Sequence, residues 1–237
     1  MGPRVDVRRA AERAVTTNSW LTSRHSFSFG DNYDPANTHH GLLLVNNDDI
    51  VAPGNGFGTH PHRDMEIVTW VLSGSLAHAD SVGNTGVIGP GLAQRMSAGT
   101  GILHSEKNES SVDPVHFIQM WVVPDEPGLT PGYQHHEVDV ADGLVPIASG
   151  RAADAAVVIH NRHAALHGAR LEAGQSVQLP EAPYVHVFVA RGDVTLEDTG
   201  AVHEGDAVRL TGSGGQRLTA TEPSEILVWE MHAGLPA

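Results

Sequence analysis

The stretch 60-HPHRDME-66 places two histidines two positions apart, and 104-HSE-106 repeats that spacing with a histidine and a glutamate. On a β-strand, the side chains at positions i and i+2 point to the same face. If both stretches are extended, His60 with His62 and His104 with Glu106 project as two pairs into one cavity. These residues therefore predict a β-rich fold with a polar site inside it.

The rest of the chain supports a β fold. Its 26 glycines and 14 prolines separate short apolar runs, a pattern typical of an all-β sandwich or barrel. Helical periodicity is confined to the residues around Val7 to Val15 and to 161-NRHAAL-166, so few short helices are expected. The predicted strands are 41-GLLLVNND, 65-MEIVTWVL, 115-VHFIQMWVV, 155-AAVVIH, 185-VHVFVA and 226-ILVWEM.

A weak internal repeat divides the chain. The segment 124-PDEPGLTPGY-133 contains three prolines and two glycines and is predicted to be a loop or linker. Before it, 70-WVLSGSLAHAD-80 precedes 89-GPGLAQRMSAG-99; after it, 187-VFVARGDVTLED-198 precedes 203-HEGDAVRLTG-212. Each copy has a strand, a turn glycine, a second strand ending in Asp and another glycine turn.

Aligning the turn glycines of the two copies shows what the second copy lacks. The positions of His60, His62 and His104 are then occupied in the second copy by Gln178, Pro180 and Leu218. The repeat therefore predicts two domains: residues 1–132, which keep the ligand-type side chains, and residues 133–237, which have the scaffold without them.

Composition excludes several classes of function. Lys plus Arg is 14 and Asp plus Glu is 28, a net charge of −14 that would repel phosphate backbones. The absence of cysteine removes disulfides, thiolate metal sites and cysteine nucleophiles. The N-terminus lacks a signal-peptide core, and no apolar run reaches the roughly 18 residues of a membrane span. A cytoplasmic protein that binds neither nucleic acid nor membrane is expected.

Three imidazoles and one carboxylate suit a divalent transition metal such as iron, nickel, copper or manganese, and zinc accepts the same set. A lone H-x-H is more often structural, but the second pair strengthens the metal hypothesis. Glu66 shares the strand parity of His60 and His62, so it is either a ligand, an acceptor for a ligand imidazole, or a carboxylate paired with Arg63 or Arg95.

The other histidines carry weaker predictions. In the pairs 39-HH-40 and 135-HH-136 the two side chains diverge in extended chain, which favours loops or the surface. His160, His163 and His167 could form a helical stripe, but no carboxylate lies at a matching offset.

Two motifs carry a resemblance to a known family. The stretch 54-GNGFGTHPHRDME-66, followed by Gly74, resembles the first cupin motif, and 99-GTGILHSEKN-108 resembles the second. The longer strings HPHRDMEIVTWVLSGSLAHADSVGN, MSAGTGILHSE and QMWVVPDEPGLTPGY, with 24-RHSFSFG-30, resemble the pirin family. The resemblance covers most of residues 20 to 135, and the C-terminal half shares only the layout.

This resemblance implies an all-β bicupin, in which two double-stranded β-helix barrels pack together and only the N-terminal one binds metal. It implies His60, His62, His104 and Glu106 as the ligands, and it implies that Glu66 is not one. The cofactor would be one divalent transition metal ion, iron(II) in first place, with nickel, copper, manganese, cobalt or zinc as alternatives.

The resemblance also implies quercetin 2,3-dioxygenase activity. A deprotonated flavonol or related phenol would bind the metal, dioxygen would add across the 2,3 bond with loss of carbon monoxide, and Glu106 would be the base. A different class of function stays open: a metal-containing protein that binds a transcription factor or a metabolic enzyme without turnover. A metal-assisted isomerase or hydrolase is a third alternative.

Overall fold

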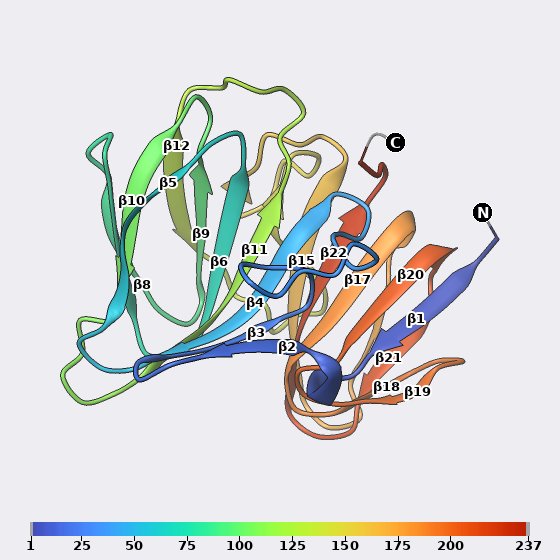
Figure 1. The fold of residues 1–237 in the computed structure, drawn as a ribbon. Helices are drawn as coiled ribbons and strands as arrows, with labels where there is room; N and C mark the ends of the chain where they lie inside the picture. Colours follow the sequence, from blue (N-terminus) through green and yellow to red (C-terminus); the bar gives the residue numbers. More distant parts are fainter. Residues whose placement is uncertain (1, 236–237) are drawn as a thin grey trace.

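The computed structural model describes residues 2–235, and its strands form two barrels that lie side by side (Figure 1). The one helical element in this range is a 3-10 turn, η1 (Ala10–Glu12). Within the same residues, no helix is long and apolar enough to cross a membrane. The prediction of an all-β bicupin with few short helices is confirmed.

The first barrel consists of two antiparallel sheets that face each other. The larger has the order β12 (Gly132–Glu137), β9 (Leu92–Ser97), β6 (Glu66–Ser73), β11 (Val115–Val122), β4 (Leu43–Val51), β3 (Leu21–His25), β2 (Ala14–Thr17). The smaller has the order β5 (Gly56–His62), β10 (Ile102–Lys107), β7 (Leu76–Asp80), β8 (Thr85–Ile88). The predicted ligand residues all lie on β5 and β10.

The second barrel repeats this plan. Its larger sheet has the order β1 (Arg4–Arg8), β20 (Ala207–Gly214), β17 (Glu181–Arg191), β22 (Ser224–Met231), β15 (Ala164–Leu171), β13 (Val145–Ser149), β14 (Val157–Val158). Its smaller sheet has the order β16 (Ser176–Gln178), β21 (Arg217–Ala220), β18 (Val194–Leu196), β19 (Gly200–Val202).

The glycines that revealed the repeat occupy equivalent positions in the two barrels. Gly74 has φ 76° and Gly192 has φ 73°, and both precede a strand of the smaller sheet. A Cβ on Gly74 would lie 2.6 Å from the Pro114 carbonyl oxygen, and one on Gly192 would collide with the Pro223 carbonyl oxygen. The left-handed backbone and the close approach both require glycine, so the internal repeat is confirmed.

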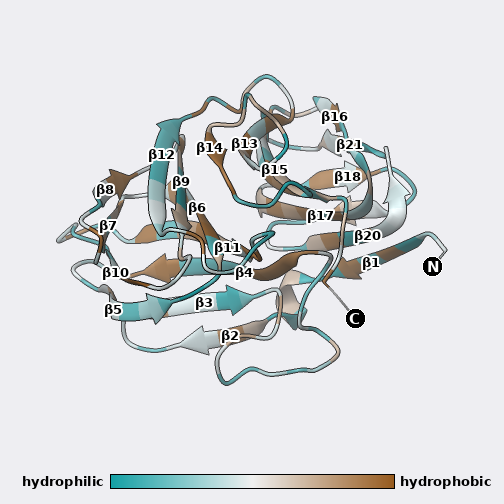
Figure 2. Ribbon diagram, turned by 90° about the horizontal axis from the view of Figure 1, so that it is seen from above, coloured by the Kyte–Doolittle hydropathy of each residue, from teal (hydrophilic) through white to brown (hydrophobic). Residues whose placement is uncertain are grey.

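The two larger sheets pack against each other through an apolar core that includes Trp70 and Trp229. In Figure 2 hydrophobic colouring appears on strands of both barrels, among them β6 and β17. Indole N–H groups from both barrels donate across this core: Trp70 to Glu225 Oε1 at 2.6 Å and Trp229 to Met120 Sδ at 3.3 Å. The second barrel is filled by valine, leucine, isoleucine and alanine side chains, whereas the first encloses polar residues.

Both predicted helical stretches are wrong. The residues around Val7 to Val15 form β1, η1 and β2, and β1 pairs with β20 of the second barrel. Residues 161–163 form a turn that leads into β15. In each case pairing with a distant strand overrides a local periodicity that spans only two or three turns. The domain boundary at 132/133 stays a prediction; β12, which starts at Gly132, pairs with β9.

Candidate metal centre

The two histidine pairs lie on adjacent antiparallel strands. β10 pairs with β5 so that His104 lies opposite His60 and Ile102 opposite His62. A register shift follows His104, which changes how Glu106 is aimed. The ligand-type nitrogens of His60, His62 and His104 lie within 4.8 Å of one another. The structure thus brings together the three histidines that the sequence singled out.

Hydrogen bonding identifies the nitrogens that face the centre of this cluster. His60 Nδ1 donates to the Gly58 carbonyl oxygen at 2.8 Å, which leaves its Nε2 with a free lone pair. That Nε2 lies 3.0 Å from His104 Nε2. Burial, together with the neighbouring imidazoles, lowers the pKa of His62 to about 4 and that of His104 to about 3. Neutral imidazoles are the form that binds a metal.

Glu106 is 2% exposed, and its two carboxylate oxygens have different surroundings. Oε2 accepts a hydrogen bond from Gln119 Nε2 at 2.7 Å, whereas Oε1 is buried without a hydrogen-bond partner. Burial raises the pKa of Glu106 to about 7. A buried, unpartnered carboxylate oxygen is costly unless a cation or a proton satisfies it, so the donor set suits a metal ion.

A second cluster overlaps the first. His78, His104 and Glu106 also bring ligand-type atoms within 4.8 Å of one another, and all three residues are buried. His78 lies on β7, next to β10, and its Nδ1 is 3.5 Å from His104 Nδ1. His104 is therefore shared, with one ring nitrogen facing His60 and the other facing His78.

Glu66 lies outside this cluster. Asp64 adopts a left-handed backbone with φ 47° between β5 and β6, which breaks the strand parity assumed from the sequence. Glu66 Oε2 accepts hydrogen bonds from Ser97 Oγ at 2.9 Å and from the His160 backbone N–H at 3.0 Å. Of the alternatives left open for Glu66, the ion pair with Arg63 or Arg95 gives way to these contacts to β9 and to the second half of the chain.

A cavity of about 380 Å³ opens beside the histidines. His60, His62 and Glu106 line it, and aromatic side chains form much of its wall. Trp20 packs edge-to-face on Phe57 at 5.3 Å, and Trp121 packs on His62 at 4.9 Å. Its polar lining residues are Thr16, Ser23, His25, Asn47, Asp49 and Gln119. The cavity can hold a flat aromatic molecule beside His60, His62 and Glu106.

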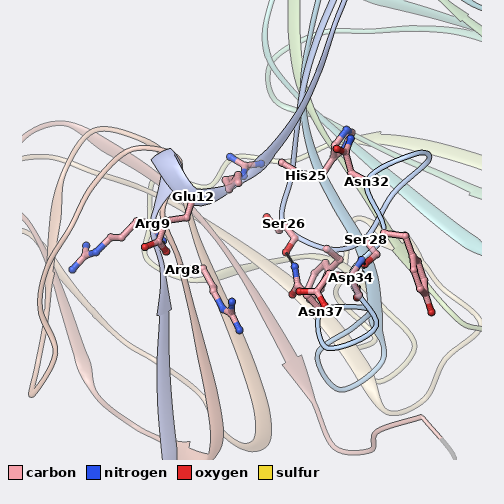
Figure 3. A pocket seen from close by; sticks show the side chains of 13 residues that line it. Arg8, Arg9, Glu12, His25, Ser26, Ser28, Asn32, Asp34 and Asn37 are labelled. Carbon is pink, nitrogen blue, oxygen red and sulfur yellow. Dashed lines mark hydrogen bonds between the residues drawn. The ribbon is translucent and has the colours of Figure 1, made fainter.

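A second cavity, of about 290 Å³, lies between the N-terminal segment and the loop after β3, and His25 lines both cavities (Figure 3). Three arginines line it, but each already has a carboxylate partner: Arg8 with Asp6, Arg9 with Asp206, and Arg13 with Asp48. Because these charges are compensated, this cavity is a weaker candidate for ligand binding than the aromatic one.

Sequence reasoning missed several residues of the site. The 76-LAHAD-80 strand carries His78 and Asp80 at the same i, i+2 spacing that drew attention to the other pairs. The aromatic wall comes from residues distant in sequence and had no local pattern. His40, predicted to lie in a loop or at the surface, is buried, and its Nε2 donates to the Val185 and Leu210 carbonyl oxygens.

The helical stripe expected for His160, His163 and His167 is absent from the described residues, since His160 and His163 lie in a turn and His167 lies on β15. His167 Nε2 contacts Glu230 Oε2 at 3.1 Å across to β22. The exposed residues His135 and His136 lie on β12, at the surface as predicted.

Fold and site together define a bicupin whose first barrel carries the ligand-type cluster and whose second barrel is apolar inside. The Pirin family model matches residues 6–122, and the model of the quercetinase C-terminal cupin domain matches residues 146–231. The chain belongs to the pirin family.

Relatives match over nearly the whole chain. A Mycobacterium tuberculosis protein with a provisional quercetin 2,3-dioxygenase name is 65% identical over 98% of this chain and 96% of its own length. Quercetin 2,3-dioxygenase of Escherichia coli K12 is 38% identical over 95% of this chain and 97% of its own length. The structure of bacterial pirin YhhW from Escherichia coli in complex with nickel(II) has a TM-score of 0.90 at 35% identity, covering 98% of this chain and 100% of that one.

Proposed function

We propose that this protein is a metal-dependent dioxygenase of the pirin type that cleaves flavonols such as quercetin with dioxygen. The observation that carries the proposal is the placement of the histidine cluster and Glu106 at the wall of an aromatic cavity. The names of the relatives support the same activity. In this proposal His60, His62, His104 and Glu106 hold one divalent metal ion.

The ion is proposed to be iron(II), and nickel(II) is the next to test because the Escherichia coli pirin was obtained as a nickel(II) complex. Nitrogen and carboxylate ligands accept several first-row metals, so supply in the cell contributes to the choice. When bound, the ion would supply Lewis-acid polarisation of the flavonol hydroxyl and a template for the two reactants.

The protein's own side chains would orient the substrate and accept its proton. Trp20, Phe57 and Trp121 give the cavity apolar walls that hold a planar ring system and exclude water. Glu106 Oε1 has no other hydrogen-bond partner, and burial holds the pKa of this carboxyl near 7. A bound cation lowers this pKa, so Glu106 would accept the proton of the flavonol 3-hydroxyl as its carboxylate partly detaches from the ion.

The test starts from protein purified without added metal. Elemental analysis quantifies bound metal, and an oxygen electrode follows uptake with quercetin on the same sample, before and after reconstitution with iron(II) or nickel(II). About one metal per chain and metal-dependent uptake are expected, and His62→Ala should abolish both. His136→Ala, at an exposed position on β12, is the matched control and should behave as the parent protein.

Metal bound at one per chain without oxygen uptake, whichever ion is used, would contradict the enzyme and favour the metal-containing interaction protein. Oxygen-independent turnover would favour an isomerase or hydrolase. Retention of both metal and activity in Glu106→Gln would remove Glu106 from the site.

A further inference from the structure

We infer that His78 and Asp80 form a positioning relay behind His104, which fixes the proton of His104 on Nδ1 and leaves Nε2 to bind the metal. The inference rests on the proposed function, because it takes His104 to be a metal ligand. Neither residue would touch the substrate or the ion; both would act through His104.

The relay lies on the pair of strands next to the proposed ligands. In the antiparallel pairing of β7 with β10, Asp80 lies opposite His104 and His78 lies opposite Glu106. The side chains of His78 and Asp80 are both fully buried. His78 Nε2 lies 3.3 Å from Asp80 Oδ2, and His78 Nδ1 lies 3.5 Å from His104 Nδ1. The three groups thus form a continuous line that ends at the histidine cluster.

The direction of hydrogen bonding along this line follows from Asp80. Its Oδ1 accepts the backbone N–H groups of Val82 at 3.0 Å and Asn84 at 2.9 Å, and its Oδ2 accepts Asn84 Nδ2 at 2.9 Å. An aspartate with this many donors is an ionised acceptor. His78 Nε2 must therefore carry the proton that it shares with Asp80.

The positions of the imidazole protons on His78 and His104 then follow. A neutral imidazole carries one N–H, so His78 Nδ1 is an acceptor, and a second proton there would be opposed by a nearby metal cation. His104 Nδ1 therefore donates to His78 Nδ1. The lone pair of His104 is left on Nε2, the atom that faces His60 Nε2 at 3.0 Å. In metal sites a carboxylate often accepts the N–H of a ligand histidine and so sets its tautomer. Here His78 stands between the carboxylate of Asp80 and His104.

Packing holds His78 in the orientation that the relay needs. The His78 ring stacks on Tyr133 with centroids 4.6 Å apart and planes 17° from parallel. Tyr133 is itself fixed, because its hydroxyl donates to Gln94 Oε1 at 2.8 Å. Gly86 makes room for this ring, since a Cβ there would collide with the Tyr133 hydroxyl.

The second barrel provides an internal comparison. Its strands β18 and β21 correspond to β7 and β10, and there Leu196 lies opposite Leu218. Both leucines are 1% exposed or less. The fold therefore does not need a histidine at the position of His78, where the second barrel has Leu196. The aspartate at the position of Asp80 is Asp198, and it is exposed. The second barrel thus lacks both the ligand-type residues and a buried His–Asp pair behind them, which ties the pair in the first barrel to the metal site.

A competing assignment makes His78 itself a ligand, since His78, His104 and Glu106 also form a compact group. That assignment requires His104 to bind through Nδ1. It leaves His104 Nε2 and His60 Nε2 3.0 Å apart without a shared partner. The two assignments place the His104 proton on different nitrogens, so they can be distinguished directly.

Asp80→Asn tests the relay with almost no change in shape. The two backbone N–H groups at Oδ1 keep the amide oxygen there, so the amide N–H₂ takes the Oδ2 position and donates to His78 Nε2. The Asn84 side-chain amide, which donates to Oδ2 in the parent, then turns to present its oxygen as an acceptor. The proton pattern then reverses, and His104 Nε2 becomes protonated. We expect about 10- to 100-fold weaker binding of zinc(II) and nickel(II) by competition with a chelating dye. Unchanged affinity would overturn the relay.

Asp139→Asn is the matched control. Asp139 Oδ1 also accepts the backbone N–H two residues ahead, at 3.1 Å from Ala141, but Asp139 is exposed and contacts no histidine in the described structure. The metal affinity of the Asp139→Asn variant should equal that of the parent protein. Far-ultraviolet circular dichroism and thermal melting of both metal-free variants separate a relay effect from loss of folding.

A second measurement reads the protons themselves. Long-range ¹H–¹⁵N spectra of metal-free protein, with His104 assigned by its loss in His104→Asn, should show the Nδ1–H tautomer in the parent and the Nε2–H tautomer in Asp80→Asn. Nε2–H in the parent would overturn the relay, as would loss of the His104 Nδ1–H signal when zinc binds. If the parent binds no metal, the proposed function fails, and the metal-free tautomers still decide the relay.

Discussion

Gln119 orients Glu106 through a chain of two hydrogen bonds that begins at Trp121. The Trp121 indole N–H donates to Gln119 Oε1 at 3.1 Å, which turns the amide so that Gln119 Nε2 donates to Glu106 Oε2 at 2.7 Å. This arrangement occupies one carboxylate oxygen and leaves the other, Oε1, unpartnered. The side chain that binds the ion in our proposal is thus aimed by a residue on the opposite sheet.

Gln119→Leu keeps the approximate shape and removes the donor. We expect metal affinity to fall about 10-fold or more, because Glu106 loses the contact that orients it. Isothermal titration with zinc(II) measures the change. Gln178→Leu, in the second barrel, is the control and should leave affinity unchanged. Equal affinity in both variants would mean that Glu106 needs no support from Gln119.

Trp20→Ala should weaken flavonol binding without touching the metal. Trp20 forms a wall of the aromatic cavity with Phe57 and contacts none of the proposed ligands in the described structure. Losing this apolar area should raise KM for quercetin about 10-fold or more, with kcat changed much less. Steady-state oxygen uptake, with metal content measured in parallel, provides the check; a loss of metal would contradict this division of roles.

Glu225→Leu should destabilise the contact between the barrels. It leaves the buried Trp70 indole N–H without its acceptor, at a cost of about 1–3 kcal/mol in the free energy of unfolding. Urea unfolding followed by tryptophan fluorescence measures this loss. Because Trp70 lies in the apolar core between the sheets and not at the cavity, metal stoichiometry should stay at the parent value.

His40 should make the protein sensitive to acid. Burial, with the nearby Arg209 charge, lowers the pKa of His40 to about 4. Because the unfolded chain binds this proton near pH 6.5 and the folded protein does not, stability is present above 6.5 and is lost as the pH falls toward 4. Metal-free His40→Gln should therefore show a shallower fall in unfolding free energy over this window. A slope equal to the parent's would show that His40 is not the responsible group.

Much of this molecule can be predicted from local spacing. The i, i+2 pairs locate His60, His62 and His104 correctly, because a strand converts that spacing into a shared face whatever the rest of the chain does. The turn glycines identify the repeat for a similar reason, since a left-handed backbone in close contact with a neighbouring strand admits few other residues.

What could not be predicted depends on distant pairing. Glu66 was placed by counting alternation through Asp64, but the left-handed turn there cancels the count. The cavity wall combines Trp20, from the bend between β2 and β3, with Phe57 on β5 and Trp121 on β11, and no local pattern joins them. His40 does lie in a loop, but its burial could not be predicted, because its acceptors, the Val185 and Leu210 carbonyl groups, are more than a hundred positions away.

The pairing of β1 with β20 has a consequence for the order of synthesis. Arg4–Arg8 is synthesised before every strand of the first barrel, whereas its partner Ala207–Gly214 is synthesised after all of them. The strands of the first barrel all lie between Ala14 and Glu137. This barrel can therefore form while Arg4–Arg8 is still unpaired. Arg4–Arg8 can then pair only after the first barrel has formed, and this pairing links the second barrel to the segment that precedes the first.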